Sequence, residues 1–306
     1  MSVPTAQWPS VRAAFAALID YAGLFPPAQL QIEQAQNEYL AARQGPFSWM
    51  LGRFIIPAAL LSGPGSSVLC GPFSLIVDPN VEAIDAAAAS RRSHAEVEAL
   101  EIPIAKTLSP LRTKISPDEA LDAVGALEAD LTVVGMRDLP AFVEIPPAAP
   151  WRDALEATMN ALARVGLSAK LRCGGASADA FPSVDSVAEF VAAAAQAGVA
   201  FKATAGLHHP VRHRDRSTGF MMHGFLNILA ASALAARGER ELLTQVIAEE
   251  DAGAFVFANE SFAWRNQVVS LAELEQTRRK LFVSYGSCSF SEPVDDLEAL
   301  GLVSAR

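Results

Sequence analysis

Short β-type runs alternate with amphipathic helical stretches along most of this 306-residue chain. From about residue 70 onward the runs SLIVD, EALEIPI, AFVEIP, KLRCGG and FKATAG are each followed by apolar residues at helical spacing. Such alternation predicts a parallel sheet, because neighbouring parallel strands need a crossover connection that is usually a helix. We therefore expect an α/β fold, a (β/α)8 TIM barrel. A doubly wound parallel sheet is the alternative, although no G-x-G-x-x-G follows a first strand.

The eight barrel strands can be counted in two ways. In the first, LIDYAGLF is the first strand, AFVFA (254–258) is the eighth, and a C-terminal tail of about 282–306 covers the barrel mouth. In the second, GRFIIP (52–57) is the first strand and LFVSYGS is the eighth. Either count gives a single domain over residues 1–306 with an N-terminal helix.

Helical spacing and capping residues indicate where the helices lie. We expect helices near 9–18, 28–44, 79–92, from Ser116, from Pro150, around 187–194, over 220–250 with a break at Gly238, and over 270–281. Met221 and Met222 would open the 220–250 helix as core residues.

Composition limits the classes of partner. A net charge of −10 argues against a general nucleic-acid binder or a binder of anionic membranes. Three cysteines without a C-x-x-C motif favour a reducing compartment. The N-terminus lacks a signal-peptide pattern, and no apolar run reaches the roughly 18 residues of a membrane helix. We expect a cytoplasmic protein with a small-molecule substrate, and a homo-oligomer is compatible with these features.

Two of the five lysines fall inside predicted strands. Lys170 lies in AKLRCGG and Lys202 in AFKATAG, each four residues after a glycine, and the two are 32 residues apart. A lysine in a buried strand is costly unless it is paired or used. Their matching positions predict that neighbouring strands direct both ammonium groups into one pocket, the candidate active site. A structural network of ion pairs is the alternative.

Side-chain alternation along the strands places further residues beside the lysines. Arg172 shares a face with Lys170, and Thr204 with Lys202, near the carboxyl ends where barrel enzymes hold their active sites. The cationic groups predict an anionic substrate with a carboxylate or phosphate. Glu144, at the end of AFVEIP, is the candidate general acid or base. Substrate binding is also predicted for Arg53 and for three glycines whose N–H groups can approach an anion, Gly174, Gly175 and Gly206.

The two lysine strands resemble the strand ends of class I aldolases such as deoxyribose-phosphate aldolase, through F-K-A-T-A-G and a second lysine followed by G-G. In that family one lysine forms a Schiff base with the substrate carbonyl, a second lowers its pKa, and a carboxylate moves protons. The resemblance implies that Lys170 matches the first strand lysine and Lys202 the second, and Glu144 is a candidate for the carboxylate. Strand order alone would make Lys170 the Schiff-base lysine, but the apolar neighbours of Lys202 favour Lys202 as the nucleophile.

A histidine-rich loop follows the Lys202 strand. His208 is a candidate proton carrier and His209 a candidate substrate ligand, while His213 and His223 lie further along the loop. The spacing matches no known zinc motif, so no metal or other cofactor is expected, with a divalent metal as the alternative. Cys288, in YGSCSF, has no base adjacent in the sequence, which argues against a catalytic thiol.

Together these features predict a lyase of the aldolase kind that acts on a small anionic carbonyl compound. One alternative is a metal-dependent isomerase or hydrolase that uses the 208–223 loop. Another is a barrel that binds an anion without catalysis.

Overall fold

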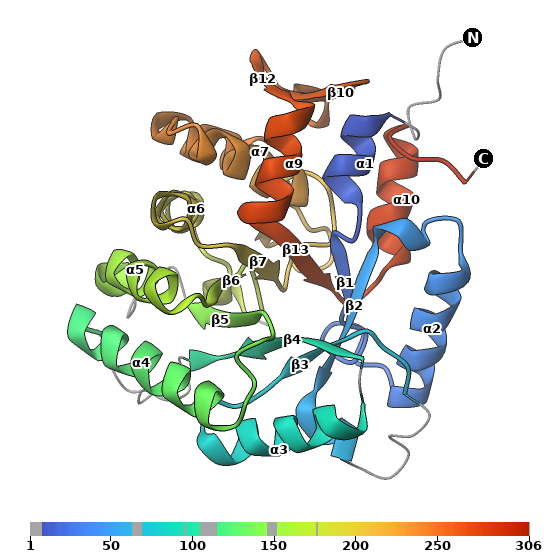
Figure 1. The fold of residues 1–306 in the computed structure, drawn as a ribbon. Coiled ribbons are helices and arrows are strands. Elements are labelled where there is room, and N and C mark those ends of the chain that lie inside the picture. The colour runs from blue at the N-terminus through green and yellow to red at the C-terminus, as the bar shows by residue number, and fades with distance from the viewer. Residues whose placement is uncertain are drawn as a thin grey trace.

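Eight parallel strands close into a barrel in the order β1-β13-β7-β6-β5-β4-β3-β2, with helices around its outside (Figure 1). The structure is a computed structural model, and it describes residues 8–62, 69–94, 96–104, 115–145, 152–175 and 177–305. The strands are β1 (Ile19–Tyr21), β2 (Leu51–Pro57), β3 (Phe73–Ile76), β4 (Val97–Ile102), β5 (Ala141–Ile145), β6 (Ser168–Arg172), β7 (Phe201–Thr204) and β13 (Phe282–Ser287). The predicted (β/α)8 fold is confirmed.

Ten α-helices accompany the strands in the described part of the chain. They are α1 (Pro9–Phe15), α2 (Ile32–Gln44), α3 (Val81–Ser93), α4 (Pro117–Val133), α5 (Leu155–Val165), α6 (Val184–Ala197), α7 (Phe225–Ala236), α8 (Leu243–Ala248), α9 (Leu271–Lys280) and α10 (Ser291–Ala299). Short 3₁₀ helices occur at Ser48–Met50, Ala58–Ser62, Arg152–Ala154, Ala178–Ala180, Arg240–Leu242 and Ala252–Ala254. None of these helices is long and apolar enough to cross a membrane.

Helix ends explain why the two lysine strands are in register. Helix α5 ends at Gly166 and helix α6 at Gly198, both in the left-handed conformation that glycine adopts without strain. Strand β6 begins two residues after Gly166 and β7 three residues after Gly198, and each lysine lies four residues after its glycine. As a result Lys170 on β6 and Lys202 on β7 are direct partners across the sheet.

AFVFA was wrongly predicted to be a barrel strand. It forms β10 (Phe255–Ala258), which pairs antiparallel with β11 (Ser261–Trp264), and β11 pairs with β12 (Gln267–Ser270). This three-stranded sheet lies outside the barrel. The side chains of β10 alternate between buried and exposed, as expected for a strand with one face toward solvent rather than a barrel strand covered by helices.

The first strand count was wrong to make residues 282–306 a tail, whereas the second count correctly made LFVSYGS a barrel strand. Residues 282–287 form β13, which pairs with β1 on one side and β7 on the other, and α10 follows it. The barrel therefore uses both LIDYAGLF and LFVSYGS. Gly286 suits β13 to a crowded interior, because a side chain at this position would meet Ile55 and Thr204.

The 220–250 segment departs from the prediction at its start. Met221 and Met222 form β9 (Met221–Met222), which pairs antiparallel with β8 (His213–Arg214), and α7 begins only at Phe225. The break at Gly238 is confirmed, with a left-handed φ of 84°. The predicted helix start at Pro150 lies outside the described residues.

Candidate active site

Six charged side chains of alternating sign occupy the barrel interior, and we call them the charge array. Its members, in order of contact, are Asp20, Lys202, Glu101, Lys170, Glu144 and Arg172. They come from five different strands. Strand register accounts for part of this grouping, because Glu144, Lys170 and Lys202 are successive partners across β5, β6 and β7.

The inner half of the charge array is closed to solvent. The ammonium of Lys202 lies 2.6 Å from Asp20 Oδ2 and 2.5 Å from Glu101 Oε1, and its side chain is 0% exposed. Ser284 donates to Asp20 and Ser74 donates to Glu101, each at 2.8 Å. These contacts satisfy charges that would otherwise be very costly to bury.

The outer half leads toward solvent. Lys170 Nζ lies 2.7 Å from Glu101 Oε2 and 3.1 Å from Glu144 Oε2, and Glu144 Oε1 is 3.3 Å from Arg172 Nη1. Arg172 has a half-exposed side chain, whereas Lys170 is buried. Exposure therefore increases along the charge array toward its Arg172 end.

The ion pairs keep Lys170, Glu101 and Glu144 charged. Burial alone would lower the pKa of Lys170, but Glu101 and Glu144 outweigh it and raise that pKa above its usual value. Burial likewise opposes ionisation of Glu101 and Glu144. Lys170 and Lys202 nevertheless lower the pKa of Glu101 to about 2, and Lys170 and Arg172 lower that of Glu144. At neutral pH the site thus presents an ammonium beside a carboxylate.

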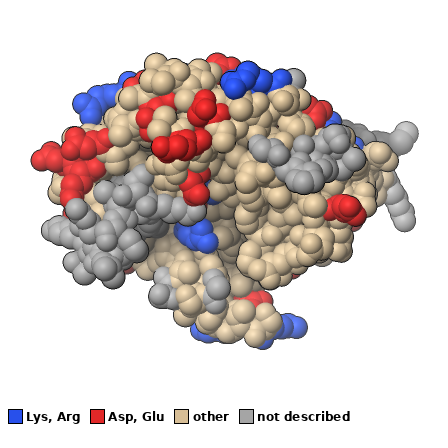
Figure 2. All heavy atoms as spheres, turned by 90° about the horizontal axis from the view of Figure 1, so that it is seen from below, with Lys and Arg blue, Asp and Glu red and all other residues tan. Residues whose placement is uncertain are grey.

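A cavity of about 1040 Å³ opens above the outer half of the charge array. It is large enough for a small metabolite. Glu101, Lys170, Glu144, Arg172 and Thr204 are among the residues that line it, and Lys202 is not among the described lining residues. Figure 2 shows one face of the molecule, hollowed near its centre, where Lys or Arg atoms are visible. The structure brings the two lysines together through Glu101, but only Lys170 faces the cavity.

Two of the predicted binding residues lie elsewhere. Arg53 pairs with Glu98 at 3.3 Å and is not among the described lining residues, because it stands near the start of β2 rather than at its carboxyl end. Gly174 is likewise absent from the described lining. A side chain at Gly174 would strike Phe181 and approach Gly206, so this glycine allows the loops after β6 and β7 to pack closely. Gly175 and Gly206 do line the cavity.

The histidine-rich loop contributes two of its four histidines. His208 and His209 line the cavity, while His213 stacks edge-on against His209 with ring centroids 4.4 Å apart. His223 is buried, and its Nε2 donates to the carbonyl of Pro182 at 2.8 Å, which is a structural role. The loop therefore forms one wall of the cavity.

Sequence reasoning missed Glu101, the residue that links both lysines. Glu101 lies in the predicted strand EALEIPI. A charge in a buried strand is costly unless it is paired or used, and this argument, which singled out the two lysines, applies equally to Glu101. Asp20 follows the same rule but is separated from Lys202 by 182 positions in the chain. Only the closure of the barrel brings β1 beside β13 and thereby Asp20 toward Lys202.

We expect the ionised carboxylate of Glu101 to make the free energy of unfolding depend on pH in the acid range. The pKa of Glu101 in the folded protein, about 2, lies below the roughly 4.3 of an unfolded glutamate. Its contribution to the free energy of unfolding is therefore complete above about pH 4.3 and is lost as the pH falls toward 2. Urea unfolding from pH 5 to 2 should show a shallower loss in Glu101→Gln than in the wild type. The carboxyl ¹³C shift of Glu101 should also remain that of a carboxylate at pH 3. A carboxyl that protonates near pH 4.3, together with parallel unfolding curves, would contradict this assignment.

No family model matches the chain, and no curated protein matches it either. Among the described residues, no group of three or more His, Cys, Asp and Glu side chains is arranged to hold a metal ion. The site is therefore defined by its own geometry: a (β/α)8 barrel with an ammonium–carboxylate pair at the floor of a mouth cavity.

Proposed function

We propose that the protein is a lyase of the aldolase kind, which makes or breaks a carbon–carbon bond next to the carbonyl of a small anionic compound. One observation supports this most directly. The ammonium of Lys170 and the carboxylate of Glu144 lie 3.1 Å apart at a cavity near the carboxyl ends of the barrel strands. Barrel enzymes hold their reacting groups in this position.

Each outer member of the charge array has a role in this chemistry. The Lys170 ammonium donates a hydrogen bond to the substrate carbonyl oxygen and stabilises the negative charge that develops there as an enolate forms. Glu144, ionised and adjacent, accepts or returns the proton. Arg172, half-exposed at the cavity, pairs with the carboxylate or phosphate of the substrate.

The raised pKa of Lys170 favours an electrophilic lysine over a Schiff-base lysine. A nucleophilic amine must lose its proton, and the carboxylates around Lys170 oppose that loss. Lys202, which the sequence favoured as the nucleophile, is fully buried against Asp20 and Glu101. We assign Lys202 to positioning Glu101, which in turn holds Lys170.

Hydrogen–deuterium exchange tests the first half of the reaction without knowledge of the complete substrate. Pyruvate, oxaloacetate and dihydroxyacetone phosphate are incubated separately with the protein in D₂O, and proton NMR follows the hydrogens next to the carbonyl. We expect catalysed exchange with at least one compound and its loss in Lys170→Met. Failure of the wild type to exchange any of them would contradict the proposal, and saturable binding without exchange would favour a non-catalytic anion-binding barrel.

Borohydride reduction in the presence of the exchanging compound separates the two roles of the lysine. An electrophilic lysine leaves the protein mass unchanged, whereas a Schiff base adds the reduced substrate to Lys170 or Lys202. A labelled lysine in the peptide map would therefore replace our electrophilic mechanism with the covalent one.

A further inference from the structure

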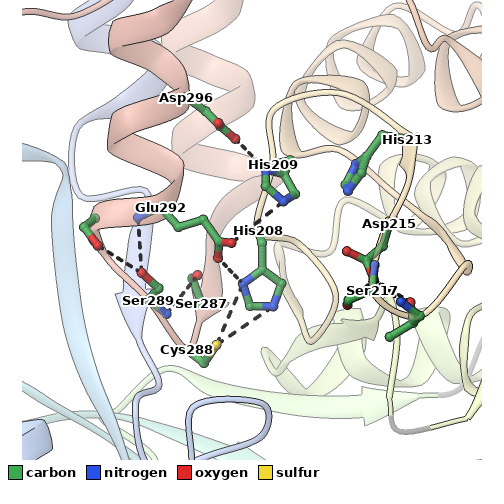
Figure 3. A network of polar contacts seen from close by, with 12 residues as sticks. His208, His209, His213, Asp215, Ser217, Ser287, Cys288, Ser289, Glu292 and Asp296 are labelled. Carbon is green, nitrogen blue, oxygen red and sulfur yellow. Dashed lines mark hydrogen bonds and ion pairs between the residues drawn. The ribbon is translucent and has the colours of Figure 1, made fainter.

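A cysteine, a histidine and a glutamate meet at another part of the cavity wall. Cys288 directly follows β13, His208 belongs to the loop after β7, and Glu292 lies in the first turn of α10. The sulfur of Cys288 is 3.8 Å from His208 Nδ1 and 4.0 Å from Nε2, and Glu292 Oε2 is 3.1 Å from Nδ1 (Figure 3). All three residues line the cavity. No base adjoins Cys288 in the sequence, but His208, 80 positions away in the chain, lies beside it in the fold.

The acidic partner of the histidine is itself held in place. Glu292 Oε1 lies 3.8 Å from His209 Nε2, and His209 Nδ1 lies 2.5 Å from Asp296 one turn further along α10 (Figure 3). The backbone N–H of Glu292 also donates to Ser289 Oγ. This arrangement orients Glu292 toward His208.

The surroundings favour a charged His208 at neutral pH. Burial lowers its pKa, but contacts with Cys288 and Glu292 outweigh that effect and raise it to about 9. Among the described residues, Tyr21 interacts with Cys288, and His209, Asp215 and Tyr285 interact with Glu292, while Asp296 pairs with His209. His208 is thus placed to exchange a proton with the sulfur of Cys288, and the thiolate is the reactive form of cysteine.

The other two cysteines provide internal comparisons. Cys70 is exposed, and Cys173 is completely buried, with a pKa raised well above its usual value by burial. Neither is among the described residues that line the cavity. Only Cys288 combines a histidine partner with a position on the cavity wall.

We propose that Cys288 is a nucleophile that adds to the carbonyl carbon of an aldehyde bound in the cavity, with His208 as its acid–base partner. The thiolate sulfur forms the bond to carbon, the electron pair of the C=O π bond moves to oxygen, and the His208 imidazolium gives that oxygen its proton. The products are a neutral hemithioacetal and a neutral imidazole, so charge and atoms balance without another reactant. This thiol chemistry goes beyond the lysine-centred lyase reaction and uses different residues.

Alkylation by iodoacetamide tests the activation of the thiol. Peptide mass spectrometry at pH 6 should show Cys288 reacting about tenfold faster than Cys70, with Cys173 unmodified. His208→Gln should remove that advantage while leaving the rate at Cys70 unchanged. A Cys288 no faster than Cys70, or unaffected by His208→Gln, would overturn the proposal.

Carbon-13 NMR with labelled glyoxylate, an aldehyde that carries a carboxylate, tests the adduct itself. A hemithioacetal carbon signal is expected with the wild type and with Lys170→Met, and no such signal with Cys288→Ser. Retention of the signal in Cys288→Ser, or its absence from the wild type, would refute the assignment. Because Lys170→Met removes the proposed lyase chemistry, the two proposals can fail independently.

Discussion

Replacing Lys202 with methionine is expected to lower the free energy of unfolding by about 3–5 kcal/mol. Methionine fills a similar volume, but it leaves Asp20 without its ammonium partner and Glu101 with only Lys170. Both carboxylates are fully buried, so water cannot replace the missing charge. Urea unfolding at pH 7, followed by circular dichroism, measures the loss.

Two further variants identify the cause of that loss. Lys280→Met removes an exposed lysine and should change the free energy of unfolding by less than about 0.5 kcal/mol. Adding Asp20→Asn to Lys202→Met removes one uncompensated charge and should recover part of the stability. If Lys202→Met costs no more than Lys280→Met, Lys202 does not neutralise the barrel interior.

Replacing Glu144 with glutamine is expected to lower the rate of carbonyl-adjacent proton exchange by about 10²–10⁴-fold. Glutamine keeps the shape and can still accept a hydrogen bond from Lys170, but it cannot take up a proton. Lys170 retains its contact with Glu101, so we expect the fold to be maintained. The exchange rate in D₂O, measured by proton NMR with the compound that the wild type enolises, gives the effect.

A matched variant controls for loss of a surface ion pair. Glu189 on α6 pairs with Arg152, and both side chains are well exposed. Glu189→Gln should therefore leave the exchange rate unchanged. An equal reduction in Glu144→Gln and Glu189→Gln, or none in Glu144→Gln, would remove Glu144 from the proposed chemistry.

The parts of the site that could be predicted from sequence are those set by local periodicity. Lys170 and Lys202 each follow a helix-ending glycine by four residues, and strand alternation then places Arg172 and Thr204 on the cavity side. Both steps use geometry within about one βα unit. The (β/α)8 class follows from the same repetition.

The parts of the fold and of the site that could not be predicted from sequence depend on contacts between segments far apart in the chain. AFVFA is as apolar as a barrel strand, and only its pairing with β11 shows that it lies outside the barrel. His208 and Cys288 are brought together because β7 and β13 are adjacent, which neither strand count anticipated. Lys202 is likewise absent from the described cavity lining, because other side chains fill the barrel between it and the cavity.

The charge array also constrains how this chain can diverge. Three cations face three carboxylates, so exchanging one member for an apolar residue leaves a surplus charge in the interior. Relatives of this protein should therefore lose or gain inner members two at a time, one acidic and one basic. Arg172, whose side chain reaches solvent, is the position at which a single replacement is tolerated, and variation in ligand preference should begin there.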